Sequence, residues 1–188
     1  MIKRLIIDAD VCIKLGTSEK YCFLQELLPC LSEKSFIHQY VYDEILTPAS
    51  AKTQLNWLIG SGFLDVIDSN DLSVLEKTIY EAAYNLLSRV MANPGKPRQN
   101  HGEISSLAMA KALSIPVFFT DERNLQPIID ANLNTGIDNI KCIRIIDVIH
   151  SIQRGKIGGF YRKQAKAMWV LSGKPKEVFD SKVWPTGQ

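Results

Sequence analysis

The sequence has few of the residues that build metal-binding fingers or disulfide scaffolds. Its four cysteines form no Cys-x-x-Cys pair and its three histidines show no ligand spacing, so we expect neither a structural zinc site nor a disulfide framework. No apolar run approaches the roughly 18 residues that a membrane span needs. Asp8 and Asp10 interrupt the apolar run near the N-terminus, which argues against a secretory signal. We therefore expect a cytoplasmic protein with no membrane partner.

Charge is distributed unevenly along the 188 residues. Residues 1–150 contain 14 Lys and Arg against 18 Asp and Glu, whereas residues 151–188 contain 8 against 2. The length fits one domain with an appendage. We therefore divide the chain into a body, residues 1–150, and a basic, helical C-terminal extension, residues 151–188. A basic extension on an acidic body favours a polyanionic partner, and a solvated surface tail is the alternative.

Apolar runs alternate with amphipathic segments in the body. Because helices separate the strands, we expect right-handed crossovers and a parallel sheet. The predicted fold is a three-layer α/β/α arrangement with about five strands, whose order the pattern does not specify. Strands are predicted at residues 5–8, 35–38, 63–67, 115–119 and 141–146. Helices are predicted at residues 19–31, 41–46, 51–59, 73–91 with Asp71 as the N-cap, 102–113, 125–131, and 147–154 with Asp147 as the N-cap.

Carboxylates follow two of the predicted strands and lie in two predicted helices. In open α/β sheets, ligands bind at the carboxyl ends of the strands. Carboxylates that converge there repel one another unless a divalent cation lies between them, and their hard oxygen atoms suit Mg²⁺ or Mn²⁺. Such ions activate water and neutralise phosphodiesters, so the pattern indicates metal-assisted phosphoryl chemistry. The six candidates are Asp8, Asp10, Glu44, Glu103, Asp121 and Glu122.

Three of these acids have a structural alternative as helix caps. Asp8 and Asp121 each follow a strand, where a carboxylate caps the next helix. Glu103 lies three residues after Asn100, as in a capping box. The hypothesis of a shared site therefore depends on the joint pattern and not on one acid.

The remaining candidates are also open to a second interpretation. Asp10 is typical of a solvated turn, and Glu44 of an exposed helical acid with Asp43 as a competitor for any role. Thr120 is either a capping hydroxyl or a hydrogen-bond donor to the site.

Four motifs, taken in order, resemble the PIN-domain nuclease family over about residues 1–150. They are a strand that ends in Asp-x-Asp, a Glu on a later helix, a Gly-Glu helix start followed by small residues, and a strand that ends in Thr-Asp-Glu. In this sequence the motifs are Asp8-Ala9-Asp10, Glu44, Gly102-Glu103-Ile104-Ser105-Ser106-Leu107-Ala108 and Thr120-Asp121-Glu122.

The resemblance implies a ribonuclease that depends on Mg²⁺ or Mn²⁺. It also implies an RNA substrate, a homodimer, and a toxin role with an antitoxin protein as partner. Lys96 and Arg98, in a loop before Glu103, are candidates for contacts with RNA phosphates. The implied catalytic residues are Asp8, Glu44, Glu103 and Asp121. The implied metal ligands are Asp8, Glu103 and Asp121, with Glu44 binding directly or through water, and with Asp10 and Glu122 as supporting residues or ligands of a second ion.

Two other functions remain open at this stage. A haloacid-dehalogenase-type phosphatase also begins with Asp-x-Asp, with Asp8 as the nucleophile and Asp10 as the general acid. However, Val11-Cys12-Ile13 departs from that family's pattern, and no middle strand ends in the Ser or Thr that it needs. The second is an inactive module that binds RNA or a protein through the C-terminal extension. The aromatic and basic residues over 160–169 suit RNA contact, although we favour a helix that packs Trp169 on the body.

Overall fold

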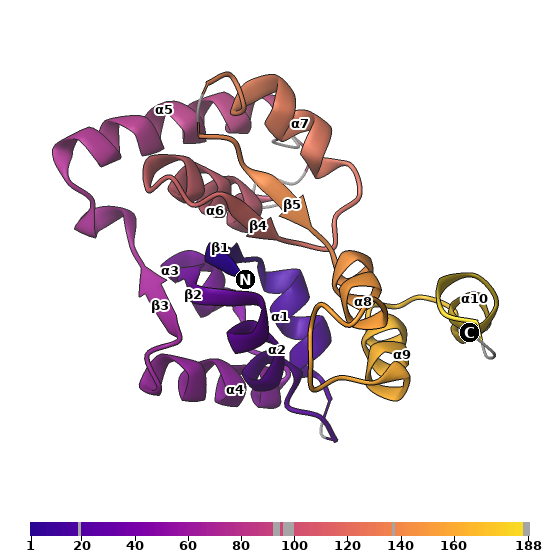
Figure 1. The fold of residues 1–188 in the computed structure, drawn as a ribbon. Helices are drawn as coiled ribbons and strands as arrows, with labels where there is room; N and C mark the ends of the chain where they lie inside the picture. The colour runs from indigo at the N-terminus through magenta and orange to yellow at the C-terminus, as the bar shows by residue number, and fades with distance from the viewer. Residues whose placement is uncertain (19, 92–94, 96–99, 137, 186–188) are drawn as a thin grey trace.

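A single parallel sheet organises the part of the chain that the computed structural model describes, residues 1–18, 20–91, 95, 100–136 and 138–185 (Figure 1). Its five strands have the order β3-β2-β1-β4-β5, and helices cover both faces. The predicted three-layer α/β/α fold is therefore confirmed. The strands are β1 (Ile2–Ile7), β2 (Ser32–His38), β3 (Leu64–Ile67), β4 (Val117–Phe119) and β5 (Lys141–Ile143).

Successive side chains of each strand belong alternately to two separate hydrophobic clusters, one on each face of the sheet. Leu5 and Ile7 belong to the larger cluster and Ile6 to the smaller one, all fully buried, because successive residues of a strand point to opposite faces. The smaller cluster lies under α5 (Val74–Met91), α6 (His101–Ala112) and α7 (Leu125–Asn132). The larger lies under α1 (Ala9–Gly16), α2 (Phe23–Leu31), α3 (Gln39–Glu44), α4 (Ala49–Gly60), α8 (Ile145–Gln153) and α9 (Arg162–Leu171).

The register of the central strands brings the ends of β1, β4 and β5 level. Ile7 is paired with Phe119, and Phe119 with Ile143. Beyond the paired residues, the Asp8 N–H donates to the Phe119 carbonyl at 3.0 Å and the Thr120 N–H donates to the Ile143 carbonyl at 3.1 Å. These bonds fix Asp8 and Thr120 at the same carboxyl edge of the sheet.

Some predicted boundaries are wrong. α1 was not predicted, and it starts directly after Asp8. The helix predicted from residue 19 begins at Phe23, and residue 19 itself lies outside the described residues. Asp71 does not cap α5 but lies in the short helix η1 (Ser69–Asp71), and Ser73 exchanges hydrogen bonds with Glu76 instead.

The strand predicted over 141–146 is three residues too long. It ends at Ile143 because α8 starts directly after Arg144, whose backbone N–H donates to the Asp147 carboxylate at 2.9 Å. Asp147 is therefore the third helical residue and not the N-cap. The apolar residues Ile145 and Ile146 extend the strand pattern past its real end.

The C-terminal extension shares the larger hydrophobic cluster with the body. Met168, Trp169 and Phe179 are buried in the cluster that contains Leu5 and Val11. This agrees with the packed-helix interpretation of α9. After α9 the chain forms α10 (Lys176–Val178) and a π-helical turn, η2 (Phe179–Val183). None of the described helices has the length and apolar character needed to cross a membrane.

Candidate functional site

Asp8 is the most deeply buried acid at the carboxyl edge of the sheet. Only 2% of its surface is exposed. Burial, followed by the negative charge of Glu103, raises the pKa of Asp8 to about 8, and Asp10 adds to the rise. An ionised carboxylate is costly in such a place unless a positive charge compensates it. The electrostatics of Asp8 therefore favour a bound cation or a proton.

Asp8 also forms the cap that was its structural alternative. Its Oδ1 accepts a hydrogen bond from the Ala9 N–H at 2.8 Å, and Asp8 is thus the N-cap of α1. Its Oδ2 accepts a long hydrogen bond, 3.4 Å, from the hydroxyl of Thr120. Thr120 is fully buried and its hydroxyl accepts from the Glu122 N–H at 3.2 Å. Thr120 is thus a donor to Asp8 and an acceptor within its own turn, and it does not cap α7, whose N-cap is Asn124.

Glu103 lies in the first turn of α6 and is near other acids. Burial raises its pKa, and the charges of Glu122, Glu44 and Asp10 add to the rise. The alternative of a capping box with Asn100 is wrong. Asn100 has a left-handed backbone conformation, and its side-chain amide donates to the Met91 carbonyl instead of capping α6. Glu103 and Asn100 therefore do not form a capping box at the start of α6.

Because Gly102 has no side chain, Glu44 can approach α6 closely. A methyl group built on Gly102 would lie 3.1 Å from Oε2 of Glu44, at the end of α3. The neighbouring acid, Asp43, instead accepts two 2.9 Å hydrogen bonds from the Gln39 amide. Glu44, and not Asp43, is thus the acid of α3 that adjoins Glu103.

Asp121 differs from the other acids because two lysines neutralise it. Its side chain is 4% exposed, and Nζ of Lys174 lies 2.8 Å from both carboxylate oxygens. Nζ of Lys14 lies 3.1 Å from Asp121 and 2.6 Å from Asp10. Asp121 is therefore not the N-cap of α7, which was its alternative. Asp10 is the partner of Lys14 in α1 and not a residue of a free turn.

Glu122 connects the acids to two surface cavities. Glu103 and Glu122 both line a cavity of about 320 Å³ between the ends of α5, α6 and α7. Glu122 also lines a cavity of about 510 Å³ along β5 and α8. The acidic edge of the sheet is therefore open to a ligand from the surface.

The donor set fits a hard divalent cation in its chemistry, because all six predicted residues supply carboxylate oxygens. Nevertheless, no three acidic, histidine or cysteine side chains of the described residues lie close enough to coordinate one ion. For the implied ligands Asp8, Glu103 and Asp121 to meet on one cation, Asp121 would have to leave Lys14 and Lys174.

Lys14 and Lys174 were not among the residues predicted for this site. Lys14 follows Asp10 by four residues on α1, a spacing that favours an ion pair, so its role could have been found. Lys174 reaches Asp121 only through the fold, and no local pattern marks it. The proposed RNA contacts Lys96 and Arg98 lie outside the described residues.

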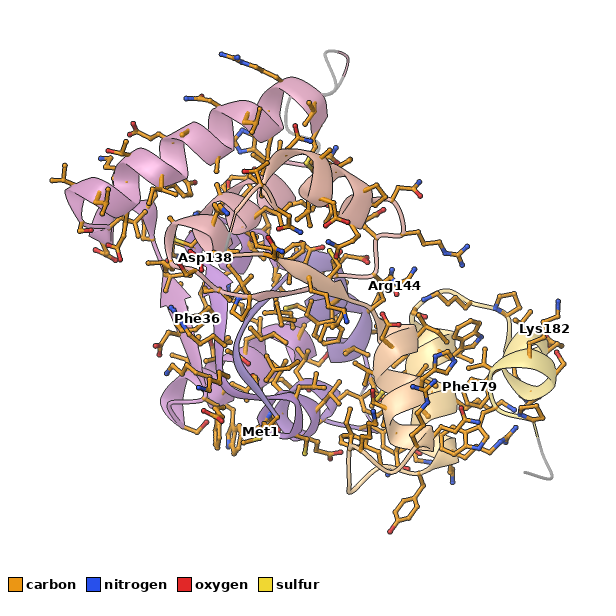
Figure 2. All side chains as sticks on the ribbon, turned by 45° about the horizontal axis from the view of Figure 1, so that its top comes forward. Met1, Phe36, Asp138, Arg144, Phe179 and Lys182 are labelled. Atoms are coloured by element: carbon orange, nitrogen blue, oxygen red, sulfur yellow. The ribbon has the colours of Figure 1, made fainter. Side chains whose placement is uncertain are left out.

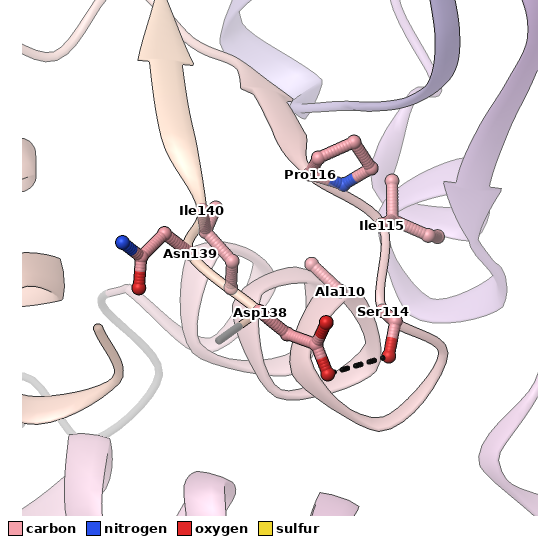
Figure 3. Close-up of a pocket in the computed structure, with 7 residues that line it drawn as sticks. All are labelled: Ala110, Ser114, Ile115, Pro116, Asp138, Asn139 and Ile140. Atoms are coloured by element: carbon pink, nitrogen blue, oxygen red, sulfur yellow. Dashed lines mark hydrogen bonds between the residues drawn. The ribbon is translucent and has the colours of Figure 1, made fainter. Parts of the chain in front are cut away.

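A further cavity, of about 120 Å³, lies at the opposite end of the strands (Figure 3). It is lined by residues that precede β4 and β5, among them Pro116 and Ile140. Its polar side chains include Ser114, whose hydroxyl donates to Asp138 at 3.2 Å. Ligands of parallel sheets bind at the other edge, so this cavity is not the candidate site.

Comparisons with protein-family models, with curated proteins and with solved structures found no match for this chain.

Proposed function

We propose that this chain is a ribonuclease of the PIN-domain type that depends on Mg²⁺ or Mn²⁺ and hydrolyses phosphodiester bonds in RNA. The observation that carries the proposal is the electrostatic coupling of Asp8 and Glu103 at the carboxyl edge of the sheet. Ionising either side chain is costly because both are buried, and the negative charge of Glu103 raises the pKa of Asp8 further. A divalent cation relieves such a cost, which supports metal binding at this edge.

The proposed ligands are Asp8, Glu103 and Asp121, with Glu44, Asp10 and Glu122 around them. When bound, the divalent cation would neutralise the phosphodiester and provide an activated water. Thr120 holds one oxygen of Asp8, and Ala9 holds the other. These two bonds fix the orientation of the carboxylate before any ligand arrives, which lowers the cost of binding.

The proposed partners are an RNA substrate, an antitoxin protein and a second copy of this chain, in the cytoplasm. An apolar stripe on α5 supports an interface with another protein. Leu75 is 71% exposed and Val90 is 52% exposed, and Ile79 and Leu86 lie between them at helical spacing.

The test is cleavage of a fluorescent single-stranded RNA in the presence of Mn²⁺. We expect the double variant Asp8→Asn, Asp121→Asn to lose at least a hundredfold of the activity, because both side chains lose their charge and keep their size. Asp43→Asn is the matched control, since the Asp43 carboxylate is hydrogen-bonded to Gln39 and lines neither cavity beside Glu122, and it should retain wild-type activity. Cleavage by the double variant at the wild-type rate would refute the proposal.

The two alternative functions predict different results. A phosphatase with Asp8 as nucleophile should be phosphorylated on that residue, which mass spectrometry after incubation with a phosphate ester detects. An inactive binding module should show no thermal stabilisation by Mn²⁺, because nothing then links the metal to the folded state.

A further inference from the structure

Two arginines border the acidic edge of the sheet. Arg123 follows the Thr120–Glu122 segment, and Arg144 lies between β5 and α8. Both line a cavity of about 310 Å³ together with Asp121, Trp169 and Lys174. Both also line the 510 Å³ cavity that contains Glu122. The two arginines therefore stand where these cavities adjoin, next to the proposed metal ligands. Figure 2 shows Arg144 at the junction of the body and the C-terminal helices.

The guanidinium groups have few partners within the protein. Arg123 is exposed and forms no ion pair with any residue that the structure describes. The Arg144 side chain is 37% exposed, and among the described residues it forms one ion pair, a 3.5 Å contact of Nε with Asp147. Asp121, the acid that lines the smaller cavity with them, is already neutralised by Lys14 and Lys174. The positive charge of the two arginines is therefore available to an external anion.

We propose that Arg123 and Arg144 form a phosphate-binding subsite for a single-stranded polynucleotide. This inference rests on the proposed function, since it supplies the contact that holds a phosphate beside the acids. A guanidinium group matches two phosphate oxygens at once and remains charged at every physiological pH. The adjoining cavities each have the volume of a typical small-ligand site, which leaves room for the sugar and base on either side of the bound phosphate. Lys174 forms the inner wall of this subsite.

The test measures binding separately from cleavage. A fluorescent 2′-O-methyl RNA, which resists hydrolysis, is titrated in EDTA against the full-length protein, and anisotropy reports the affinity. Arg123→Gln and Arg144→Gln should each weaken binding about tenfold, because each loses a charge-assisted contact. Each should also lower the slope of log affinity against log salt by about 0.7, the value for one phosphate contact on a single strand.

Lys3→Gln is the matched control, because Lys3 is an exposed cation near the start of β1 and lines neither cavity. It should bind like the wild type. Arg144 directly precedes α8, so Arg144→Gln could unfold part of the protein. In that case the affinity of Arg123→Gln alone tests the subsite, because the Arg123 side chain is exposed and its loss should not affect folding. Equal weakening by all three variants, or unchanged binding by both arginine variants, overturns the subsite. Arginine-dependent binding by a protein that cleaves no RNA supports the subsite and overturns the ribonuclease.

Discussion

At the scale of single residues, the buried carboxyl group of Asp8 makes stability depend on pH. Its pKa is about 8 in the folded protein against an ordinary 3.8. Between these values the folded state binds a proton that the unfolded state has released. The stabilisation from this proton is therefore complete below about pH 4 and is lost as pH rises towards 8. One such proton changes the free energy of unfolding by about 1.4 kcal/mol per pH unit.

We therefore expect the melting temperature in EDTA to fall between pH 5 and pH 8, and to fall less in Asp8→Asn. An Asn side chain still accepts from the Ala9 N–H, so the variant should be more stable than the wild type at pH 8. The melting temperature of Asp8→Asn should still fall somewhat with pH, because burial also raises the pKa of Glu103. Asp65→Asn is the control, since Asp65 is half exposed. Parallel curves for Asp8→Asn and the wild type would contradict the prediction.

Lys174 is the second residue whose removal has a defined effect. Its ammonium group pairs with Asp121, the carboxylate that the proposed divalent cation would also need. Lys174→Ala should therefore tighten Mn²⁺ binding by several-fold in calorimetry and, as part of the subsite, weaken binding of the 2′-O-methyl RNA. Lys176→Ala, an exposed lysine two residues away, should leave both unchanged. Weaker Mn²⁺ binding by Lys174→Ala would mean that the lysine does not compete with the metal.

At the scale of elements, the contact between α1 and α4 depends on a glycine. A methyl group on Gly16 would lie 2.4 Å from the Cβ and 2.6 Å from the Cα of Ala51. Because backbone atoms would have to move, Gly16→Ala should destabilise the protein by about 1–3 kcal/mol, measured by denaturant unfolding. Gly60→Ala is the control, since a methyl group there meets nothing within 4 Å. A stable Gly16→Ala variant would show that the helices separate easily.

The elements also show what local pattern does and does not specify. The apolar runs at Leu5–Ile7 and Val117–Phe119 are buried on both faces, so their strands were predicted. α1 was missed because it is only eight residues long and follows the strand without a turn. The sheet order places β1 beside β4. These strands are more than a hundred residues apart, and no local sequence pattern in either one indicates that they pair. Asp8 and Asp121 stand out in the sequence because they follow apolar strands, whereas Lys174 does not because its contact with Asp121 depends on the docking of α9.

At the scale of the whole molecule, one ion pair joins the body and the C-terminal extension within the part of the chain that the structure describes. The sequence predicted a basic extension and an acidic body, but not the place of contact. Lys174 brings the extension to Asp121, and its ammonium group also lies 5.2 Å from the centre of the Trp169 ring. The extension is thus part of the candidate site as well as of the hydrophobic core, so the boundary at residue 150 does not separate two folding units.

A shared core predicts that the body and the extension unfold together. Trp169 is 7% exposed, packs in the larger cluster and donates its indole N–H to the Pro175 carbonyl at 2.8 Å. Trp169→Ala should therefore cost about 3 kcal/mol and lower the melting temperature of a single calorimetric transition. Val170→Ala, a neighbouring residue that is 46% exposed, should change it little. A body transition that stays at its wild-type temperature would show that the extension is an independent unit. Weaker RNA binding without a loss of stability would instead make Trp169 a nucleic-acid contact.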